Sequence, residues 1–487
     1  MIGLTLREIA DAVGGTLHDV DGTEVVTGTV EFDSREVTPG GLFLALPGAA
    51  FDGHDYAAAA VERGAVAVLA ARPVDAPSVV VPPVSEAHTR AFALAADKDG
   101  SGAAVMAALA KIARLVAGRL IEAGLTVVGV TGSSGKTSTK DLIAQVLAPT
   151  GATVAPPGSF NNELGHPWTV LRADEHTKHL VLELSARGPG HIASLCHTAP
   201  PRIGAVINVG TAHLGEFGTR EDIAKAKGEL VEQLPEDGVA VLNADDPLVA
   251  AMASRTRARV VLVGVAESAH VRAVDITLDD QARASFRLVT PKGEAQVTLG
   301  LHGAHHVGNA LTAAAIGLEL GATPQEVADR LTGAQRVSDR RMEVTTRADG
   351  VTVINDAYNA NPESVTAALK TLATMARAGN RRRSWAVLGV MAELGDESVR
   401  GHDEIGRLAV RLDINRLVVV GDQARAMHQG ASLEGSWGEE SVLVPDVDAA
   451  VALVRAELAP GDLVLVKASK SAALWRVAEA LLAEDAQ

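Results

Sequence analysis

The sequence predicts an α/β protein of three domains: a small N-terminal α/β domain, a central domain with a parallel sheet and a phosphate-binding loop, and a C-terminal Rossmann-like α/β domain. Three observations support this. The length of 487 residues suits about three domains of roughly 100–200 residues each. Short apolar strand-like runs alternate with helix-like segments, which favours parallel sheets covered by helices. A glycine-rich turn, "VTGSSGKTSTK" (Val130–Lys140), joins one such run to a helical pattern.

The N-terminal domain is assigned to residues 1–122. Its apolar runs, such as "GLFLAL" (Gly41–Leu46) and "AVAVLA" (Ala65–Ala70), are short and separated by Gly, Pro and Asp. This punctuation is typical of a small mixed α/β unit. The polar stretch Asp97–Gly102 indicates an exposed loop, and the apolar spacing that follows over residues 105–116 predicts a helix.

The central domain is assigned to residues 123–335. It opens with "LTVVGV" (Leu125–Val130), a near-continuous apolar run typical of a strand buried on both faces. The same pattern returns at Leu180–Leu184, Ile203–Val209, Gly238–Asn243 and Arg259–Gly264. Such βα alternation predicts a largely parallel sheet, with ligands bound at the carboxyl ends of its strands.

The C-terminal domain is assigned to residues 336–487 and predicts a second α/β sheet. Its apolar strands each run into small or polar residues, as the carboxyl ends of parallel strands often do. The strands are expected at Val351–Asp356, Trp385–Val390, Arg416–Gly421 and Asp462–Ser469.

Composition narrows the classes of function. The net charge of −16 argues against nucleic acid as a partner, because a phosphate backbone requires a basic face. The most apolar stretch, residues 103–121, contains Lys111, Arg114 and Arg119, so no membrane span is expected. The N-terminus lacks an apolar signal core, and the single Cys196 fits a reducing compartment, so we expect a cytoplasmic protein.

The glycine-rich turn is the strongest functional signal. It ends in Gly-Lys-Thr but lacks the first glycine of the usual phosphate loop, since Val130 occupies that position. Lys136 is expected to meet the β- and γ-phosphates, and the Thr137 hydroxyl to reach Mg²⁺. The alternative is a Ser/Gly turn that happens to precede a lysine. The residues predicted to bind ATP here are Gly132, Ser133, Ser134, Gly135, Lys136, Thr137 and Ser138.

The form T-G-S-S-G-K-T resembles the loop of the Mur ligase family, whose members use ATP to join amino acids or peptides to a UDP-sugar peptide. Further segments carry the resemblance along nearly the whole chain, namely "FDSREVTPGG", "SFNNELGHP", "LELSARGPGH", "INVGTAHLGEF", "LHGAHHVGNALTAAAIG", "DRRMEV", "INDAYNANPESV" and "VLGVMAELGDES". "ARGPGH" and "INDAYNANP" are most similar to the branch that adds D-alanyl-D-alanine.

Four residues are predicted to hold metal: Thr137, Glu183, His213 and Lys227. Glu183 ends a buried strand, where a carboxylate would suit Mg²⁺, although a surface glutamate is the alternative. The resemblance implies two Mg²⁺ ions, with His213 at the second and Lys227 carbamylated by CO₂. Carbamylation requires a neutral amine, so Lys227 must be shielded, whereas a solvated helix lysine is the alternative. Lys225 is interpreted as an ordinary surface residue. Lys136, Lys227 and His213 form the predicted catalytic set.

The resemblance adds three ATP contacts from later segments: Asn309 near the adenine, Arg341 and Asp356. Asn309 has an equally simple alternative as a helix cap. The predicted substrate-binding residues are Ser34, Arg35, Asn161, Asn162, Tyr358, Asn359 and Asn361. Arginine is a good bidentate partner for a diphosphate, although Arg35 alone would be read as an ordinary surface residue.

The resemblance implies ATP-dependent formation of a peptide bond between UDP-N-acetylmuramoyl-tripeptide and D-alanyl-D-alanine through an acyl phosphate, in peptidoglycan precursor synthesis. We expect a monomer. One rival is another amide ligase of the same superfamily, either amino-acid-adding or similar to folylpolyglutamate synthase. The other is a phosphate-loop NTPase that uses hydrolysis as a switch.

Three places depart from the family pattern. Residues 95–119 are expected to be an insertion, Lys467–Glu479 replaces the usual C-terminal run, and Ser185 stands where glycine is more usual.

Overall fold

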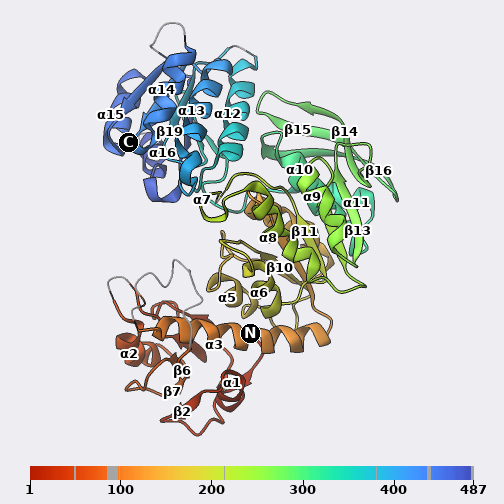
Figure 1. The fold of residues 1–487 in the computed structure, drawn as a ribbon, viewed down its shortest axis with the longest axis vertical. Helices are drawn as coiled ribbons and strands as arrows, with labels where there is room; N and C mark the ends of the chain where they lie inside the picture. The colour runs from red at the N-terminus through yellow and green to blue at the C-terminus, as the bar shows by residue number, and fades with distance from the viewer. Residues whose placement is uncertain are drawn as a thin grey trace.

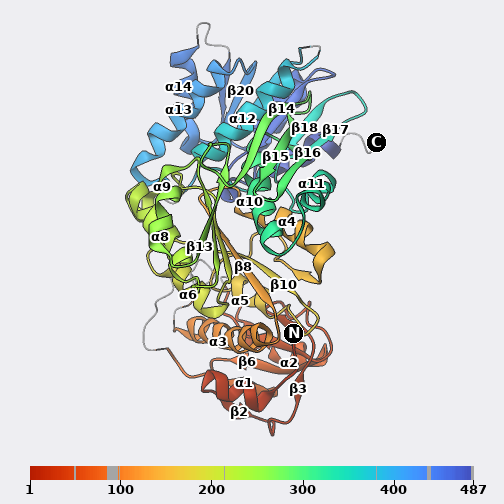
Figure 2. The same cartoon turned by 90° about the vertical axis from the view of Figure 1, so that its right-hand side faces the viewer.

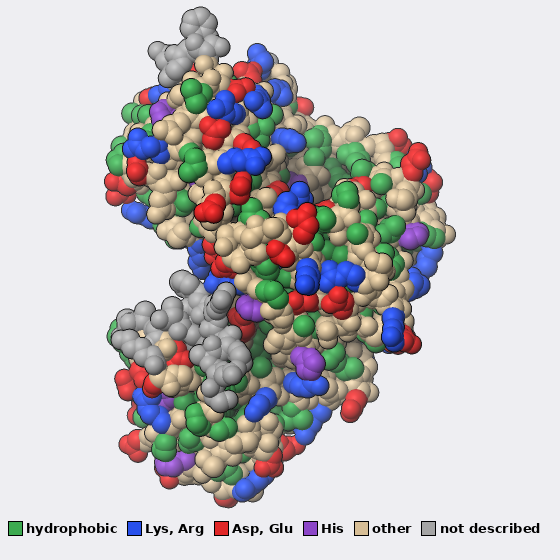
Figure 3. Space-filling model, in the orientation of Figure 1, with side chains coloured by type: hydrophobic (Ala, Val, Ile, Leu, Met, Phe, Trp, Pro, Cys, Tyr) green, Lys and Arg blue, Asp and Glu red, His purple; other side chains and the backbone are tan. Residues whose placement is uncertain are grey.

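The computed structural model describes residues 1–48, 51–84, 97, 99–212, 214–379, 381–435 and 440–483. Three large sheets form three units that follow one another along the long axis of the molecule (Figures 1 and 2). The predicted α/β class is therefore confirmed. In space-filling view the surface is indented between the N-terminal and C-terminal units, and acidic and basic side chains are interspersed on this face (Figure 3).

The N-terminal unit is built on a five-stranded sheet of order β2-β7-β6-β5-β4. Two strands coincide with the predicted runs, β5 (Gly41–Leu44) and β6 (Ala65–Ala70). The other strands are β2 (Thr16–His18), β7 (Ser78–Val80) and β4 (Val30–Glu31); β1 (Leu4–Thr5) and β3 (Val25–Val26) form a separate antiparallel pair, and the helices are α1 (Leu6–Val13) and α2 (Ala57–Glu62).

A long helix, α3 (Ser101–Glu122), joins the N-terminal unit to the central one (Figure 1). Its residues Leu109, Ile112 and Val116 are fully buried in a core that includes side chains of both units. The helix begins inside the predicted loop and includes its last two residues, Ser101 and Gly102. Most of the stretch predicted as an insertion therefore belongs to a helix that the two units share.

The central unit is a nine-stranded sheet of order β16-β15-β14-β13-β12-β11-β8-β10-β9. The strands from β9 to β14 pair in parallel, whereas β14, β15 and β16 are antiparallel. The strands are β8 (Thr126–Thr131), β9 (Thr153–Val154), β10 (His179–Glu183), β11 (Ile203–Val206), β12 (Val239–Asn243), β13 (Arg259–Gly264), β14 (Val271–Leu278), β15 (Arg283–Thr290) and β16 (Gly293–His302). The antiparallel extension is absent from the sequence-based prediction.

Helices cover both faces of this central sheet, as a parallel sheet requires. One apolar core contains side chains of α4 (Lys136–Leu147), α10 (His306–Glu319) and α11 (Pro324–Gly333). The opposite core contains those of α5 (Gly165–Val170), α6 (His191–Thr198) and α8 (Arg220–Glu232). Two short helices, α7 (Leu214–Phe217) and α9 (Pro247–Ala250), follow β11 and β12 respectively.

The C-terminal unit is a six-stranded sheet of order β17-β18-β22-β19-β20-β21, parallel except at β17. Its strands are β17 (Glu343–Thr346), β18 (Thr352–Asn355), β19 (Ser384–Leu388), β20 (Arg416–Val420), β21 (Ser441–Val444) and β22 (Leu463–Lys467). One face packs against α12 (Pro362–Arg377), α13 (Ser398–Arg411) and α14 (Arg425–Glu434), and the other against α15 (Val447–Glu457) and α16 (Trp475–Leu482). Within the described ranges, no helix is long and apolar enough to cross a membrane.

Candidate active site

The glycine-rich turn connects β8 to α4, as the sequence predicts. Gly135 adopts φ +79°, a conformation that favours glycine, and it immediately precedes the first residue of α4. A Cβ on Gly132 would lie 2.3 Å from Ile207 Cγ1, so no side chain fits there. The first turn of α4 leaves N–H groups without intrahelical acceptors, which makes it a site for anions.

Asn208, which follows β11, fixes the shape of this loop. Its Oδ1 accepts hydrogen bonds from the Ser133 and Ser134 N–H groups at 2.8 and 3.0 Å, and its Nδ2 donates to Ser134 O at 3.0 Å. The Ser133 hydroxyl in turn accepts from Gly210 N at 2.9 Å. Ser133 and Ser134 are thereby held in place by protein groups.

Glu183 meets Thr137 at the carboxyl edge of the sheet. The Thr137 hydroxyl donates to Glu183 Oε2 at 2.9 Å, and Asn161 Nδ2 donates to Oε1 at 2.6 Å. Ser185 donates to the Asn161 side chain at 3.1 Å, so the serine found in place of glycine orients that amide. Glu183 is 1% exposed, which excludes the alternative of a surface residue.

Two lysines lie beside this pair, of which Lys136 is half-buried and Lys227 is buried. Lys136 Nζ donates to Gly132 O at 2.8 Å, and burial lowers the pKa of Lys136 while Glu183 opposes that shift. Lys227, on α8, is 4% exposed, and burial followed by the nearby Lys136 charge holds its pKa well below 10.5. Among the described residues, no hydrogen bond or ion pair satisfies the Lys227 amine. Lys225 is exposed, as expected.

Residues of the C-terminal unit reach the same cluster. Arg341 Nη2 donates to the Thr137 hydroxyl at 3.0 Å, and its guanidinium carbon lies 4.2 Å from the centre of the Tyr358 ring. The Tyr358 hydroxyl is 2.6 Å from the Ser159 hydroxyl of the central unit. Arg341 Nε is buried with no hydrogen-bond partner in the described part of the chain.

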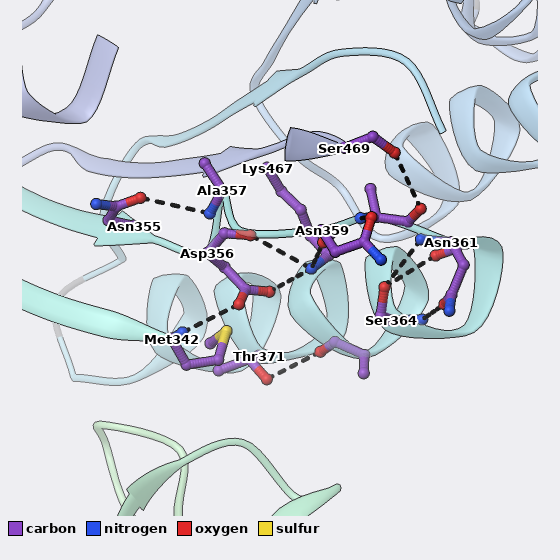
Figure 4. A network of polar contacts seen from close by, with 12 residues as sticks. Met342, Asn355, Asp356, Ala357, Asn359, Asn361, Ser364, Thr371, Lys467 and Ser469 are labelled. Atoms are coloured by element: carbon purple, nitrogen blue, oxygen red, sulfur yellow. Dashed lines mark hydrogen bonds and ion pairs between the residues drawn. The ribbon is translucent and has the colours of Figure 1, made fainter. Parts of the chain in front are cut away.

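Asp356 anchors a polar network at the end of β18 (Figure 4). Lys467 Nζ lies 2.6 Å from Asp356 Oδ2 and donates to Asn359 O at 2.9 Å, while Met342 N donates to Asp356 Oδ1 at 3.0 Å. The pair is almost fully buried, with Lys467 3% and Asp356 8% exposed. Through Met342, this network fixes the segment that carries Arg341.

Asn309 is a buried residue within α10, and it does not cap that helix, because the N-cap position is His305. The alternative interpretation as a cap is therefore wrong. Its amide lies 3.3 Å from His306 Nδ1, and its Oδ1 is 3.0 Å from the position a Cβ on Gly135 would take. His306 and Arg341 both line a cleft between α4, α10 and the linker at residues 335–342.

The remaining predicted substrate residues are spread more widely. Ser34 and Arg35 lie in the N-terminal unit, and Arg35 is exposed and held by Asp33, with Nη2 2.6 Å from Oδ2. Asn162 Oδ1 accepts from Gly165 N at 2.9 Å, next to the start of α5. Asn359 is exposed, whereas Asn361 caps α12 by accepting from Ser364 N at 2.8 Å. In the described part of the chain, no hydrogen bond or ion pair joins Ser34 or Arg35 to the phosphate loop.

Metal ligation is only partly visible. His213 lies outside the described residues. Within the described ranges, no three His, Cys, Asp or Glu side chains gather closely enough to hold a metal. Of the predicted ligands that the structure describes, Thr137 and Glu183 are joined by a hydrogen bond.

The sequence-based reasoning missed two residues of this site, Asn208 and Lys467. Both stand at or just past the end of a buried strand, where polar side chains face the ligand edge of a parallel sheet. That position is a signal in the sequence, since Lys467 ends the apolar run "DLVLVK" and Asn208 follows "IGAVI".

Comparison with known proteins agrees with this geometry. Family models described as "Mur ligase family, catalytic domain", "Mur ligase middle domain" and "Mur ligase, glutamate ligase domain" match residues 28–115, 130–317 and 340–470. The first match extends through residue 115 and so spans most of the stretch predicted as an insertion.

A UDP-N-acetylmuramoyl-tripeptide–D-alanyl-D-alanine ligase of Mycobacterium bovis is 59% identical over 503 residues, covering 100% of this chain and 99% of the relative. The crystal structure of MurF from Acinetobacter baumannii superposes with a TM-score of 0.83 at 29% identity, covering 99% of each chain. MurF from Thermotoga maritima in complex with ADP gives 0.76 at 28% identity, covering 95% of this chain and 98% of that one.

The three-unit α/β fold and the phosphate loop define an ATP-dependent ligase. The chain belongs to the Mur ligase family.

Proposed function

We propose that the protein joins D-alanyl-D-alanine to UDP-N-acetylmuramoyl-tripeptide at the expense of ATP, in peptidoglycan precursor synthesis. The observation that carries the substrate assignment is the 59% identity, over the whole chain, to a ligase of that name. The chemistry rests on the cluster of Lys136, Thr137, Glu183 and Arg341, which unites two units of the chain around one anion site.

The first half-reaction transfers the γ-phosphoryl group of ATP to the terminal carboxylate of the tripeptide. A carboxylate oxygen attacks phosphorus, the bond to the β,γ-bridging oxygen breaks, and ADP leaves. Both reactants are anionic, so positioned cations must offset their repulsion and the charge on the transferring oxygens. Lys136 and the first turn of α4 receive the phosphates, and Arg341 adds a second cation.

The residues present suit Mg²⁺, which prefers oxygen ligands and shares them with substrate phosphates. Thr137 and Glu183 offer two buried oxygens 2.9 Å apart at the mouth of the phosphate loop. These two residues would hold one ion, and His213 with a carbamylated Lys227 would hold a second. Bound there, Mg²⁺ would neutralise charge on the phosphate oxygens.

Lys227 also suits carbamylation. Only a neutral amine reacts with CO₂, and burial lowers the pKa of Lys227. Its low exposure and its proximity to Lys136 make a second positive charge unfavourable there, whereas a carbamate would be an anion beside a cation.

In the second half-reaction the amine of D-alanyl-D-alanine attacks the acyl phosphate carbon. The bond between the acyl carbon and the phosphate oxygen breaks, inorganic phosphate leaves, and the amine loses a proton. Water would compete, so the C-terminal unit must close on the site. Its contacts are in place: Tyr358 with Ser159, Arg341 with Thr137, and Glu363, which accepts from Thr211 N at 2.8 Å.

The proposal assigns the rest of the chain accordingly. The domains are residues 1–122, 123–335 and 336–487. The UDP-sugar peptide is bound by Ser34, Arg35, Asn161 and Asn162. ATP is bound by Asn309 and Asp356, and the incoming dipeptide by Tyr358, Asn359 and Asn361. A cytoplasmic location fits, because ATP is a cytoplasmic substrate, and we expect a monomer. Light scattering of the purified protein measures the oligomeric state.

The deciding experiment measures phosphate release with ATP and Mg²⁺ while each substrate is omitted in turn. We expect release to require both UDP-N-acetylmuramoyl-tripeptide and D-alanyl-D-alanine, and a UDP-sugar pentapeptide to appear by mass. Activity with a single amino acid instead of the dipeptide would favour another amide ligase of the family. Equal hydrolysis without either substrate would favour an NTPase switch and overturn the proposal.

A further inference from the structure

A buried hydrogen bond links the N-terminal unit to the central unit. The indole Nε1 of Trp168, in α5, donates to Glu31 Oε2, at the end of β4, at 3.2 Å. Trp168 is 7% and Glu31 9% exposed. Burial raises the pKa of the Glu31 carboxyl, while the bond from Trp168 opposes that shift. A buried carboxyl between two units is costly unless it is hydrogen-bonded, so the contact resists loss.

Aromatic and cationic side chains enclose this bond. The Trp168 ring packs against Phe160 at 4.7 Å between centroids and edge-on against Phe32 at 6.1 Å. The Arg172 guanidinium carbon lies 4.7 Å from the centre of the Trp168 ring. Phe32 comes from the N-terminal unit and the other two from the central unit, so the cluster fixes how the units meet.

Each partner lies next to a segment proposed to bind substrate. Glu31 directly precedes the segment that contains Ser34 and Arg35. On the other side, Trp168 N donates to Leu164 O at 3.2 Å, and a Cβ on Gly165 would lie 2.7 Å from Phe160, so α5 packs closely on residues 159–164. Asn161 in that loop donates to Glu183. A short covalent and packed path therefore runs from Arg35 through Glu31 and Trp168 to Glu183.

We propose that Glu31 and Trp168 are positioning residues that set the separation between the UDP-sugar end of the substrate and the Glu183 site, and so select the length of its peptide. This inference rests on the proposed function. The substrate must span from the N-terminal unit to the phosphate loop, because its nucleotide and its reacting carboxylate lie at opposite ends. A fixed junction between the two units therefore determines which peptide length reaches from one site to the other.

The test compares Trp168→Phe, Glu31→Gln and the double variant with the wild type. Trp168→Phe keeps an aromatic ring but removes the N–H donor. We expect it to raise KM for UDP-N-acetylmuramoyl-tripeptide about tenfold, equivalent to about 1.4 kcal/mol, and to leave KM for ATP within about twofold. The preference for UDP-N-acetylmuramoyl-tripeptide over UDP-N-acetylmuramoyl-dipeptide should fall. Glu31→Gln retains a carbonyl acceptor and should show a smaller effect, and the double variant should be no worse than Trp168→Phe.

Trp385→Phe is a matched control within a single unit. Trp385 Nε1 donates to Asp462 Oδ2 at 2.9 Å, and Trp385 is fully buried in the C-terminal unit. We expect this variant to lose thermal stability while keeping KM for the UDP-sugar substrate. If Trp168→Phe behaves in the same way, with unchanged KM and unchanged length preference, the positioning role is overturned. Absence of product from the wild type would instead count against the proposed function, so the wild type is assayed before any variant.

Discussion

Two buried lysines, Lys227 in the central unit and Lys467 in the C-terminal unit, differ in what neutralises them. Both are almost inaccessible, at 4% and 3% exposed. Lys467 has a carboxylate 2.6 Å away at Asp356, together with a backbone acceptor at Asn359. Lys227 has the cation Lys136 nearby and no hydrogen-bonding or ionic partner in the described ranges.

This difference indicates that Lys467 stabilises the fold, whereas Lys227 acts in the reaction. A buried charge needs a partner, and otherwise it loses its proton. Lys467 retains a partner and holds the segment that carries Arg341. At Lys227, burial favours the neutral amine, beside the turn that is proposed to bind phosphate. The contrast predicts that removing one lysine damages the fold, while removing the other damages the reaction.

The largest expected effect is on stability, from Lys467→Met. This change leaves Asp356 buried without its cation, which should cost about 3–5 kcal/mol of unfolding free energy. Chemical denaturation, monitored through the transition of the C-terminal unit, measures it. The double variant Lys467→Met/Asp356→Asn removes both charges and should recover much of the loss. Equal stability of the single variant and the wild type would show that the pair contributes little.

The second effect is on catalysis, from Lys227→Met. Loss of one positioned charge-stabilising group should lower kcat by about 10²–10³-fold. The fold should remain intact, because no partner is left unsatisfied. Lys225→Met, two residues away on the exposed face of α8, is the control and should keep wild-type kcat. A Lys227→Met enzyme with normal kcat would remove Lys227 from the mechanism and end the contrast with Lys467.

A third test uses pH to measure the effect of Lys227 on stability. In bicarbonate-free buffer the folded protein keeps the Lys227 pKa well below 10.5, whereas the unfolded chain does not. Between those two values the unfolded state binds the extra proton, so stability rises with pH. Lys227→Met should therefore be more stable than the wild type at neutral pH, by an amount that shrinks as pH approaches 10.5. A constant difference would contradict the lowered pKa.

The same preparations, supplied with ¹³C-bicarbonate, should show a carbamate carbon resonance that Lys227→Met lacks. Lys467→Met should keep the resonance if it is folded. A resonance that survives in Lys227→Met would assign the carbamate to another lysine.

Parts of this contrast could be predicted from the sequence and others could not. Local patterns were sufficient for the buried strands and for the phosphate loop, because apolar runs and a glycine turn are encoded by neighbours in the chain. The antiparallel extension was missed although "RASFRLVT" (Arg283–Thr290) alternates in the way a half-buried strand does. Runs buried on both faces are more conspicuous than such alternation.

Partnerships between distant residues were harder to predict. Asp356 and Lys467 are 111 positions apart, and only the parallel pairing of β18 with β22 brings them together. Likewise, nothing local distinguishes Lys227 from Lys225 except helical phase, which buries one and exposes the other. The resemblance to the family selected Lys227, and the structure supplies the physical reason in its burial.

The smallest effect concerns Asn361, which lies beside the Lys467 network but carries no charge. Its Oδ1 caps α12 by accepting from Ser364 N, and its Nδ2 lies 3.5 Å from Ser133 O in the phosphate loop. Asn361→Ala should cost about 1 kcal/mol of stability through the lost cap, well below the cost of Lys467→Met. Asn361→Asp keeps the acceptor but loses the donor, so it should retain that stability. If Asn361→Asp also keeps KM for D-alanyl-D-alanine, the residue is only a helix cap; if KM rises while stability holds, the amide has the proposed role in binding the dipeptide.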